Sequence, residues 1–288
     1  MHALPFLVAL ASAAILAPAV LRALSAGGHT KPNYRSRELP CPFGVLALAV
    51  SLLALIPLML LQKLTSTQLF HTEALPIAVY ALGVIGLGLI DDTLGPGGPG
   101  GPGGPGEPDR PVQRGWRGHG AAVLRGEPST GALKAAGSLG LALFTMSYLE
   151  LSNGRWLLAA AVLALATNAF NLLDLRPGRS TKAFVLLGAG LGIGSGEVRP
   201  LWSLGLFVAP ALVAGFYDLR ERAMLGDTGA NLLGALAGLW LVLTLSGTGQ
   251  LVALVLLAAI TLYGELRSIS ALVERIPGLR ELDAWGRP

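Results

Sequence analysis

The chain has 288 residues, of which 52% are hydrophobic and 13% charged, and its mean hydropathy is +0.61. This composition excludes a soluble globular domain and predicts an all-α, polytopic membrane protein. A formal net charge of +4 gives no indication of a nucleic-acid partner. The single cysteine, Cys41, allows no internal disulfide, and we expect a small buried side chain there.

Nine apolar runs approach or reach the length that crosses about 30 Å of hydrocarbon. They lie at 3–21, 42–62, 74–90, 135–149, 156–173, 183–195, 201–217, 230–246 and 250–264. With the N-terminus outside, one set of loops contains only Lys63, Arg155 and Arg199, and the other set contains all the remaining Lys and Arg. The positive-inside rule makes that second set cytoplasmic.

We expect a membrane domain over residues 1–266 and a cytoplasmic C-terminal segment over 267–288. The loop at 27–42 is basic and interrupted by prolines, so we expect it to be irregular. The Gly/Pro-rich loop at 95–115 lacks side chains to bury and is predicted to be disordered. Apolar residues at helical spacing predict one amphipathic C-terminal helix on the cytoplasmic surface, namely Leu266, Ile269, Leu272, Val273 and Ile276.

Three groups of acidic residues stand at the ends of apolar runs. Asp91 and Asp92 follow the third run, Asp174 follows the fifth, and Asp227 precedes the eighth. An unpaired carboxylate in hydrocarbon costs several kcal/mol, so each of these must reach water, a cation or a partner. The predicted topology places all of them at the cytoplasmic face, which predicts one shared site.

Amides and basic residues accompany these acids. Asn168, Asn171 and Asp174 recur every three residues at the end of the fifth run, and Arg176, Arg179 and Lys182 follow directly. Lys134 lies one turn into the fourth run, where Ser129 or Thr130 is expected to cap a helix N-terminus suited to anions. The alternative for Lys134 is a snorkelling side chain on an ordinary capped helix.

Oxygen ligands at such a site favour Mg²⁺, with Mn²⁺ as a second option, held by one or two carboxylates together with substrate phosphates. The three ordered motifs, ending with Gly226-Asp-Thr-Gly-Ala-Asn231, resemble those of the polyprenyl-phosphate N-acetylhexosamine-1-phosphate transferases. That family includes the phospho-N-acetylmuramoyl-pentapeptide transferase of peptidoglycan synthesis. The resemblance covers nearly the whole chain.

The resemblance implies Mg²⁺-dependent transfer of a sugar-1-phosphate from a nucleotide sugar, UDP-linked in the family, to a polyprenyl phosphate. It implies a bacterial-type plasma membrane, a site facing the cytoplasm, and a role in cell-wall or surface glycan synthesis. The other partner is membrane lipid, and a homodimer is left open. The implied residues are Asp91, Asp92, Asp174 and Asp227 for catalysis, Asp227, Asp92 and Asn171 for the metal, and Lys134, Asn168, Asn171, Arg176, Arg179 and Lys182 for substrate.

The chain also departs from the family pattern. The family continues past the matched Asp174 as Gly-Leu-Asp-Gly, whereas this chain has Leu175-Arg-Pro-Gly178, and Met224 replaces an aromatic residue that stacks on uracil. These departures predict a divergent paralogue with a changed nucleoside half of the site. A second hypothesis is a catalytically lapsed member that acts as a lipid-phosphate-binding or scaffold protein. A third, a secondary transporter, expects acids near the bilayer midplane on broken helices, unlike the pattern here.

Overall fold

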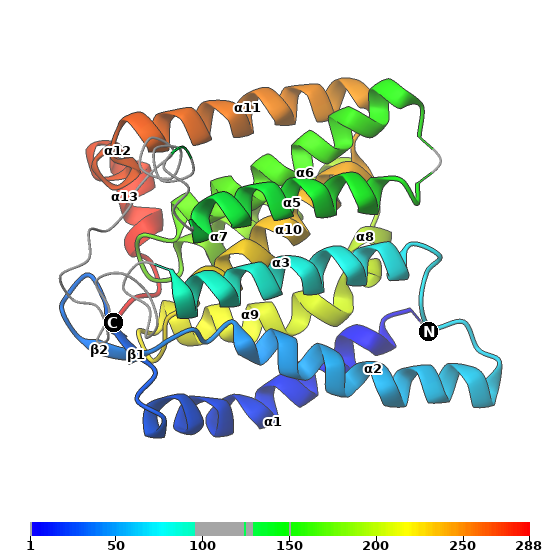
Figure 1. Ribbon diagram of the computed structural model, residues 1–288, viewed down its shortest axis with the longest axis horizontal. Helices are drawn as coiled ribbons and strands as arrows, with labels where there is room; N and C mark the ends of the chain where they lie inside the picture. Colours follow the sequence, from blue (N-terminus) through cyan, green and yellow to red (C-terminus); the bar gives the residue numbers. More distant parts are fainter. Residues whose placement is uncertain (1, 96–123, 125–128, 150) are drawn as a thin grey trace.

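The computed structural model describes all residues except 1, 96–123, 125–128 and 150. In this part of the chain almost every element is a helix (Figure 1). The longer helices are α1 (Leu4–Ala26), α2 (Val45–Thr65), α3 (Ala74–Leu94), α5 (Thr130–Met146), α6 (Asn153–Leu173), α7 (Arg179–Ser195), α9 (Gly205–Leu219), α10 (Gly226–Thr244) and α11 (Gly247–Leu266). The short elements are β1 (Thr30–Pro32), β2 (Glu38–Pro40), α8 (Arg199–Ser203), α12 (Ile269–Arg275) and α13 (Pro277–Ala284).

Each of the nine predicted runs overlaps one of the longer helices. Six of these are long and apolar enough to cross a membrane, namely α1, α2, α3, α6, α10 and α11. Helix α9 is a shorter apolar helix of 15 residues, and α5 and α7 have 17 residues each. The prediction of an all-α, multi-pass membrane protein is therefore confirmed, whereas nine spans and a cytoplasmic orientation stay predictions.

Helix α10 lies at the centre of the bundle, where α3, α6, α7 and α9 pack around it (Figure 1). Every residue from Thr228 to Val242 is buried. Close packing against α6 depends on Gly234, because a Cβ there would lie 2.6 Å from the carbonyl oxygen of Ala166. A small residue in this place lets two backbones approach, as expected for helices packed in a membrane.

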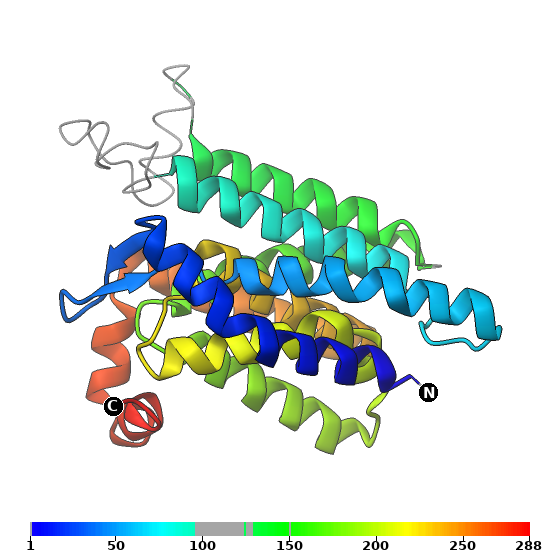
Figure 2. The same cartoon turned by 90° about the horizontal axis from the view of Figure 1, so that it is seen from below.

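The two ends of the bundle differ. Figures 1 and 2 show the N-terminus at one end and the β-hairpin, α12, α13 and the C-terminus at the other, which we call the hairpin end. The segment after β2 joins the start of α10 to this end, since the amides of Phe43 and Gly44 donate to the carbonyl oxygens of Met224 and Leu225. The hairpin end therefore contains the start of α10, where one of the acidic motifs lies.

One local prediction was wrong. The loop at 27–42, predicted to be irregular, forms the antiparallel pair β1–β2 in the register Lys31 opposite Leu39. The Asn33 side chain closes the turn by accepting from the amides of Arg35 and Arg37, a turn that asparagine favours. The predicted C-terminal helix is present as α12, and a second helix, α13, follows it because Pro277 cannot continue α12. Apart from Gly95, the predicted loop at 95–115 lies outside the described residues.

Candidate functional site

Two of the predicted acids meet on one lysine. The Nζ of Lys134, on α5, lies 2.6 Å from Oδ2 of Asp91 at the end of α3, and it also contacts Oδ2 of Asp227 on α10. Ser129 caps α5 by accepting from the amide of Ala132 at 3.2 Å, which fixes the helix start close to Lys134. Three elements far apart in sequence thus bring together two carboxylates and one ammonium group.

Lys134 does not pair with every oxygen atom of the two carboxylates. Oδ1 of Asp91 is buried and has no hydrogen-bond partner within the described chain, although buried polar atoms are normally paired. The Asp227 side chain is 30% exposed, so the group remains open to solvent on that side. We call Asp91, Lys134 and Asp227 the acidic cluster.

Asp92 has a different role from its neighbour Asp91. It is 4% exposed, and it accepts from the amides of Asp227 at 3.1 Å and Thr228 at 2.8 Å and from the Thr228 hydroxyl at 2.7 Å. A carboxylate in this place caps the N-terminus of α10 from another helix. Both of its oxygens are used, with Lys31 3.6 Å from Oδ1. Asp92 therefore positions Asp227.

A glycine permits this cap. Gly226 has φ +69°, and a Cβ there would lie 2.7 Å from Oδ2 of Asp92. Gly88, one turn before Asp92, faces Thr228, because a Cβ on it would come within 2.7 Å of the Thr228 Cα. These two glycines let the end of α3 reach the start of α10.

Asp174 ends α6 and lies beside a carboxylate that the sequence analysis did not single out. Asp218, on α9, is buried and accepts from the amide of Gly178 at 2.6 Å and from that of Leu225 at 3.3 Å. It joins the turn after α6 to the loop before α10. Burial, with the nearby charges of Asp218 and Asp227, raises the pKa of Asp174 well above its ordinary value. The sequence could have identified Asp218, since it too follows directly after an apolar run.

The amides predicted beside Asp174 form no hydrogen bond with the acidic cluster among the described residues. Nδ2 of Asn168 lies 3.5 Å from Oγ1 of Thr261 on α11, which is a long hydrogen bond. The carbonyl oxygen of Asn171 accepts from the Asp174 amide. Their predicted roles as substrate and metal ligands stay predictions.

The three basic residues after Asp174 are engaged by the C-terminal helices. Arg179 makes two parallel hydrogen bonds to Asp283, at 2.8 Å from Nε and 3.0 Å from Nη2. Nζ of Lys182 donates to the carbonyl oxygens of Leu282, Asp283 and Trp285 at the end of α13. Arg176 pairs with Glu274 at 3.2 Å. In this structure these cations hold residues 269–285 onto the bundle.

A small cavity lies beside Asp174. It has a volume of about 50 Å³, and Tyr34, Asp174, Arg176 and Met224 are among its lining residues. The Arg176 guanidinium stacks 4.4 Å from the centre of the Tyr34 ring. This volume holds a few water molecules, whereas pockets for small molecules measure about 300–1,000 Å³. A nucleobase therefore needs the loop that carries Tyr34 to move.

That loop is fixed by a buried acid. Glu221 accepts from the Tyr34 hydroxyl at 3.1 Å and forms ion pairs with Arg35 at 3.4 Å and Arg37 at 3.5 Å. Its side chain is fully buried, so its charge requires these partners. Arg35 and Arg37 of the basic loop thus pair with a buried carboxylate.

The oxygen atoms at the acidic cluster fit a divalent cation in part. Among the described residues, no group of three or more His, Cys, Asp and Glu could hold a metal ion by itself. Mg²⁺, however, takes one or two carboxylates together with substrate phosphates, and Asp91 and Asp227 offer two. The Lys134 ammonium lies between them where a cation is favoured, and Oδ1 of Asp91 has no hydrogen-bond partner in the part of the chain that the structure describes. Asp92 fits less well, since both of its oxygens already accept hydrogen bonds.

Fold and site together define a polytopic helical membrane protein with an acidic cluster at the hairpin end of its bundle. Comparison of the chain with protein-family models and with curated proteins finds no match. Assignment to a family of transferases therefore depends on the three sequence motifs and on the geometry described above.

Proposed function

We propose that the chain transfers a sugar-1-phosphate from a nucleotide sugar, with UDP as the first choice, to a polyprenyl phosphate at the cytoplasmic face of a bacterial-type plasma membrane. The products are a polyprenyl-diphosphate sugar and the nucleoside monophosphate. A new P–O bond forms to the acceptor phosphate, and the bond between the two phosphates of the donor breaks. The monophosphate leaves with the bridging oxygen.

One observation carries this proposal. Asp91 and Asp227 belong to motifs 136 positions apart by number and nevertheless share the ammonium of Lys134, while Asp92 caps the helix that starts with Asp227. A site for two phosphate-bearing substrates needs carboxylates to hold a cation and a lysine to meet phosphate charge. The acidic cluster supplies both kinds of group at one end of a membrane bundle.

Within this proposal each residue has a definite task. Lys134 balances part of the negative charge of Asp91 and Asp227 before substrate binds and meets a phosphate oxygen afterwards. Asp92 keeps the start of α10 in place, which makes it a positioning residue. Mg²⁺, when held by Asp91 and Asp227, would neutralise charge that develops on the departing phosphate.

The test uses the purified full chain in detergent with undecaprenyl phosphate, MgCl₂ and a panel of nucleotide sugars, and it measures release of the nucleoside monophosphate. We expect release from at least one donor, loss of release on chelation with EDTA, and a loss of about a hundredfold or more in Asp227→Asn. The matched control is Glu197→Gln, because Glu197 is exposed in the turn between α7 and α8. No product from any donor with correctly folded protein would count against the proposal.

A second function, lipid-phosphate binding without turnover, is favoured by the cavity of about 50 Å³ beside Asp174. A chain that binds only the lipid phosphate has no need for a nucleoside pocket. This function predicts that undecaprenyl phosphate binds to the protein while no nucleotide sugar competes or reacts. Binding of a nucleotide sugar at micromolar concentration would exclude it.

A further inference from the structure

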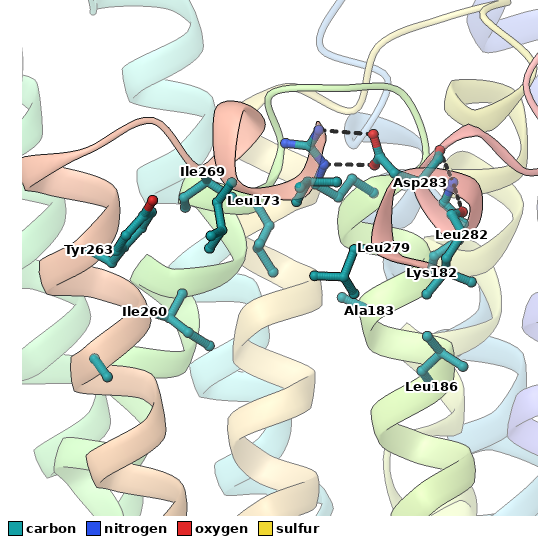
Figure 3. A pocket seen from close by; sticks show the side chains of 14 residues that line it. Leu173, Lys182, Ala183, Leu186, Ile260, Tyr263, Ile269, Leu279, Leu282 and Asp283 are labelled. Carbon is teal, nitrogen blue, oxygen red and sulfur yellow. Dashed lines mark hydrogen bonds and ion pairs between the residues drawn. The ribbon is translucent and has the colours of Figure 1, made fainter. Parts of the chain in front are cut away.

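A larger cavity lies apart from the acidic cluster, between α7 and α11 and beneath α12 and α13 (Figure 3). Its volume is about 430 Å³, which falls in the usual range of about 300–1,000 Å³ for pockets that bind small molecules. The lining is almost wholly apolar and includes Leu173, Ala183, Leu186, Ile260, Leu272 and Leu279. We call it the α7–α11 groove.

The groove opens onto the surface that the bundle presents to hydrocarbon. Leu186 on α7 is 52% exposed and Ile260 on α11 is 38% exposed, and α11 is one of the helices long and apolar enough to cross a membrane. A hollow of this kind on a membrane helix is filled by lipid, because water there would leave the apolar lining hydrated. A hydrocarbon chain is therefore the ligand that matches the lining.

The polar end of the groove has the chemistry of a phosphate site. Arg179 presents its guanidinium fork to the Asp283 carboxylate, and Lys182 donates to the last carbonyl oxygens of α13 (Figure 3). An arginine fork takes a phosphate in the same bidentate geometry as a carboxylate. Asp283 is the only acid among the lining residues, and Arg287 also pairs with it at 2.8 Å.

We propose that the α7–α11 groove binds an anionic bilayer phospholipid, with one hydrocarbon chain against the apolar lining and the phosphate on Arg179 and Lys182 in place of Asp283. In this structure Asp283 occupies the phosphate position, so α13 and the lipid compete for the same two cations. Neither Arg179 nor Lys182 contacts the acidic cluster in the described chain, and this lipid site does not depend on transferase activity.

The experiment is native mass spectrometry of the full chain in detergent, titrated with phosphatidylglycerol, phosphatidylcholine and undecaprenyl phosphate. We expect phosphatidylglycerol to bind about tenfold more tightly than phosphatidylcholine, as charge-assisted hydrogen bonds require. Asp283→Asn should tighten that binding several-fold because the competitor is weakened, and Arg179→Gln should weaken it about tenfold. Both changes remove the ion pair between Arg179 and Asp283, so their opposite effects separate phosphate binding from simple loss of that pair.

Two further variants complete the design. Ala183→Phe fills the apolar part of the groove and should reduce binding of phosphatidylglycerol, while Arg22→Gln removes one positive charge from the exposed end of α1 and should leave it unchanged. Equal affinity for the two phospholipids, or no gain in Asp283→Asn, would overturn the proposal. Tighter binding of undecaprenyl phosphate than of phosphatidylglycerol that is lost in Ala183→Phe would also overturn it, since the groove would then serve the polyprenyl lipid. If Arg179→Gln fails to fold by size-exclusion chromatography, Asp283→Asn and Ala183→Phe decide.

Discussion

At the scale of single residues, the Lys134 ammonium lies where a metal cation would lie between Asp91 and Asp227, and it balances part of their negative charge. Lys134→Met should leave two carboxylates close together without compensation, and removal of one partner from a buried pair is costly. We expect a lower melting temperature, and we expect MgCl₂ to raise it by more in this variant than in the original chain, because bound ligand stabilises the folded state. Thermal unfolding followed by tryptophan fluorescence measures both effects.

The control for that experiment is the double variant Lys134→Met, Asp91→Asn. It removes one of the two carboxylates, so the additional stabilisation by MgCl₂ should disappear. The same MgCl₂ effect in the double variant and the single variant would show that the ion acts elsewhere, and the acidic cluster would then not be a metal site. Choline chloride at equal ionic strength separates the effect of the metal from screening.

Asp92 carries a structural prediction of its own. Asp92→Ala should leave the amides of Asp227 and Thr228 and the Thr228 hydroxyl without their acceptor. Each unsatisfied buried donor costs about 1–3 kcal/mol, and a loss of that size lowers the melting temperature by several degrees. Glu197→Ala, at an exposed position, should leave the melting temperature unchanged. An unaltered melting temperature in Asp92→Ala would show that Asp92 does not cap α10.

The sequence predicted which acids lie near one another better than it predicted their partners. An acid at the end of an apolar run is visible locally, and that rule identified Asp91, Asp174 and Asp227. The partner of Arg179 is Asp283, 104 positions away, and no local pattern contains such a pair. For the same reason Arg179 was predicted to meet substrate, although in this structure it holds α13.

At the scale of the elements, Asp283 is one of the groups that attach the C-terminal helices, together with Lys182 and Arg176. Burial acts to raise the pKa of Asp283, but hydrogen bonds and charges from Arg179 and Arg287 outweigh it, so the pKa lies below its ordinary value of 3.8. A lowered pKa means that the attachment is at full strength above pH 3.8 and is lost as the pH falls through the lower value in the folded protein. We expect α13 to stay docked at pH 5 and to detach only in stronger acid.

A spin label measures this attachment. Glu281→Cys in a Cys41→Ser background places the label on the exposed side of α13, and its mobility reports docking. Mobility should be low and constant from pH 8 to about pH 5 and should rise below pH 3.8. In Asp283→Asn the label should be more mobile than in the parent chain between pH 5 and pH 8. Release of α13 already between pH 7 and pH 5 would contradict the role given to Asp283.

Elements with strong apolar runs were predicted well, and those that depend on tertiary contacts were not. Helix α2 begins at Val45 and ends at Thr65, against a predicted run of 42–62, because its length and composition suffice to define it. The hairpin β1–β2 was missed, since its two strands of three residues are too short for a periodic pattern. Its stability comes from the Asn33 turn and from the distant Glu221, which accepts from Asn33 and Tyr34.

At the scale of the whole molecule, the alternation of helices explains why the acidic motifs meet. Asp92 at the end of α3 caps the start of α10, and Gly178 after α6 donates to Asp218 just before the loop to α10. Two passes along the bundle separate the ends of successive odd-numbered runs, so these ends return to the same side of the bundle. The sequence predicted this convergence through topology, whereas the distances between the acids required the structure.

Topology itself gives the last prediction. If the three shorter helices α5, α7 and α9 also cross the membrane, the turns at the two ends of the bundle must face opposite sides. We expect single cysteines at Gln68, Ser152, Glu197 and Thr248 to react with a membrane-impermeant maleimide in intact cells, in a Cys41→Ala background. Cysteines at Arg37, Leu175, Arg220 and Glu281 should react only after the membrane is permeabilised.

The basis for this expectation is the charge of the loops, because all Lys and Arg except Lys63, Arg155 and Arg199 lie on the side predicted to be cytoplasmic. Each position named is exposed in the structure, so failure to react reports the membrane and not burial. A short helix that does not cross would place the labels before and after it on the same side. If labels at the hairpin end reacted in intact cells, the orientation would be the reverse of the predicted one. The acidic cluster would then face away from cytoplasmic nucleotide sugars, which would remove the basis for the transferase.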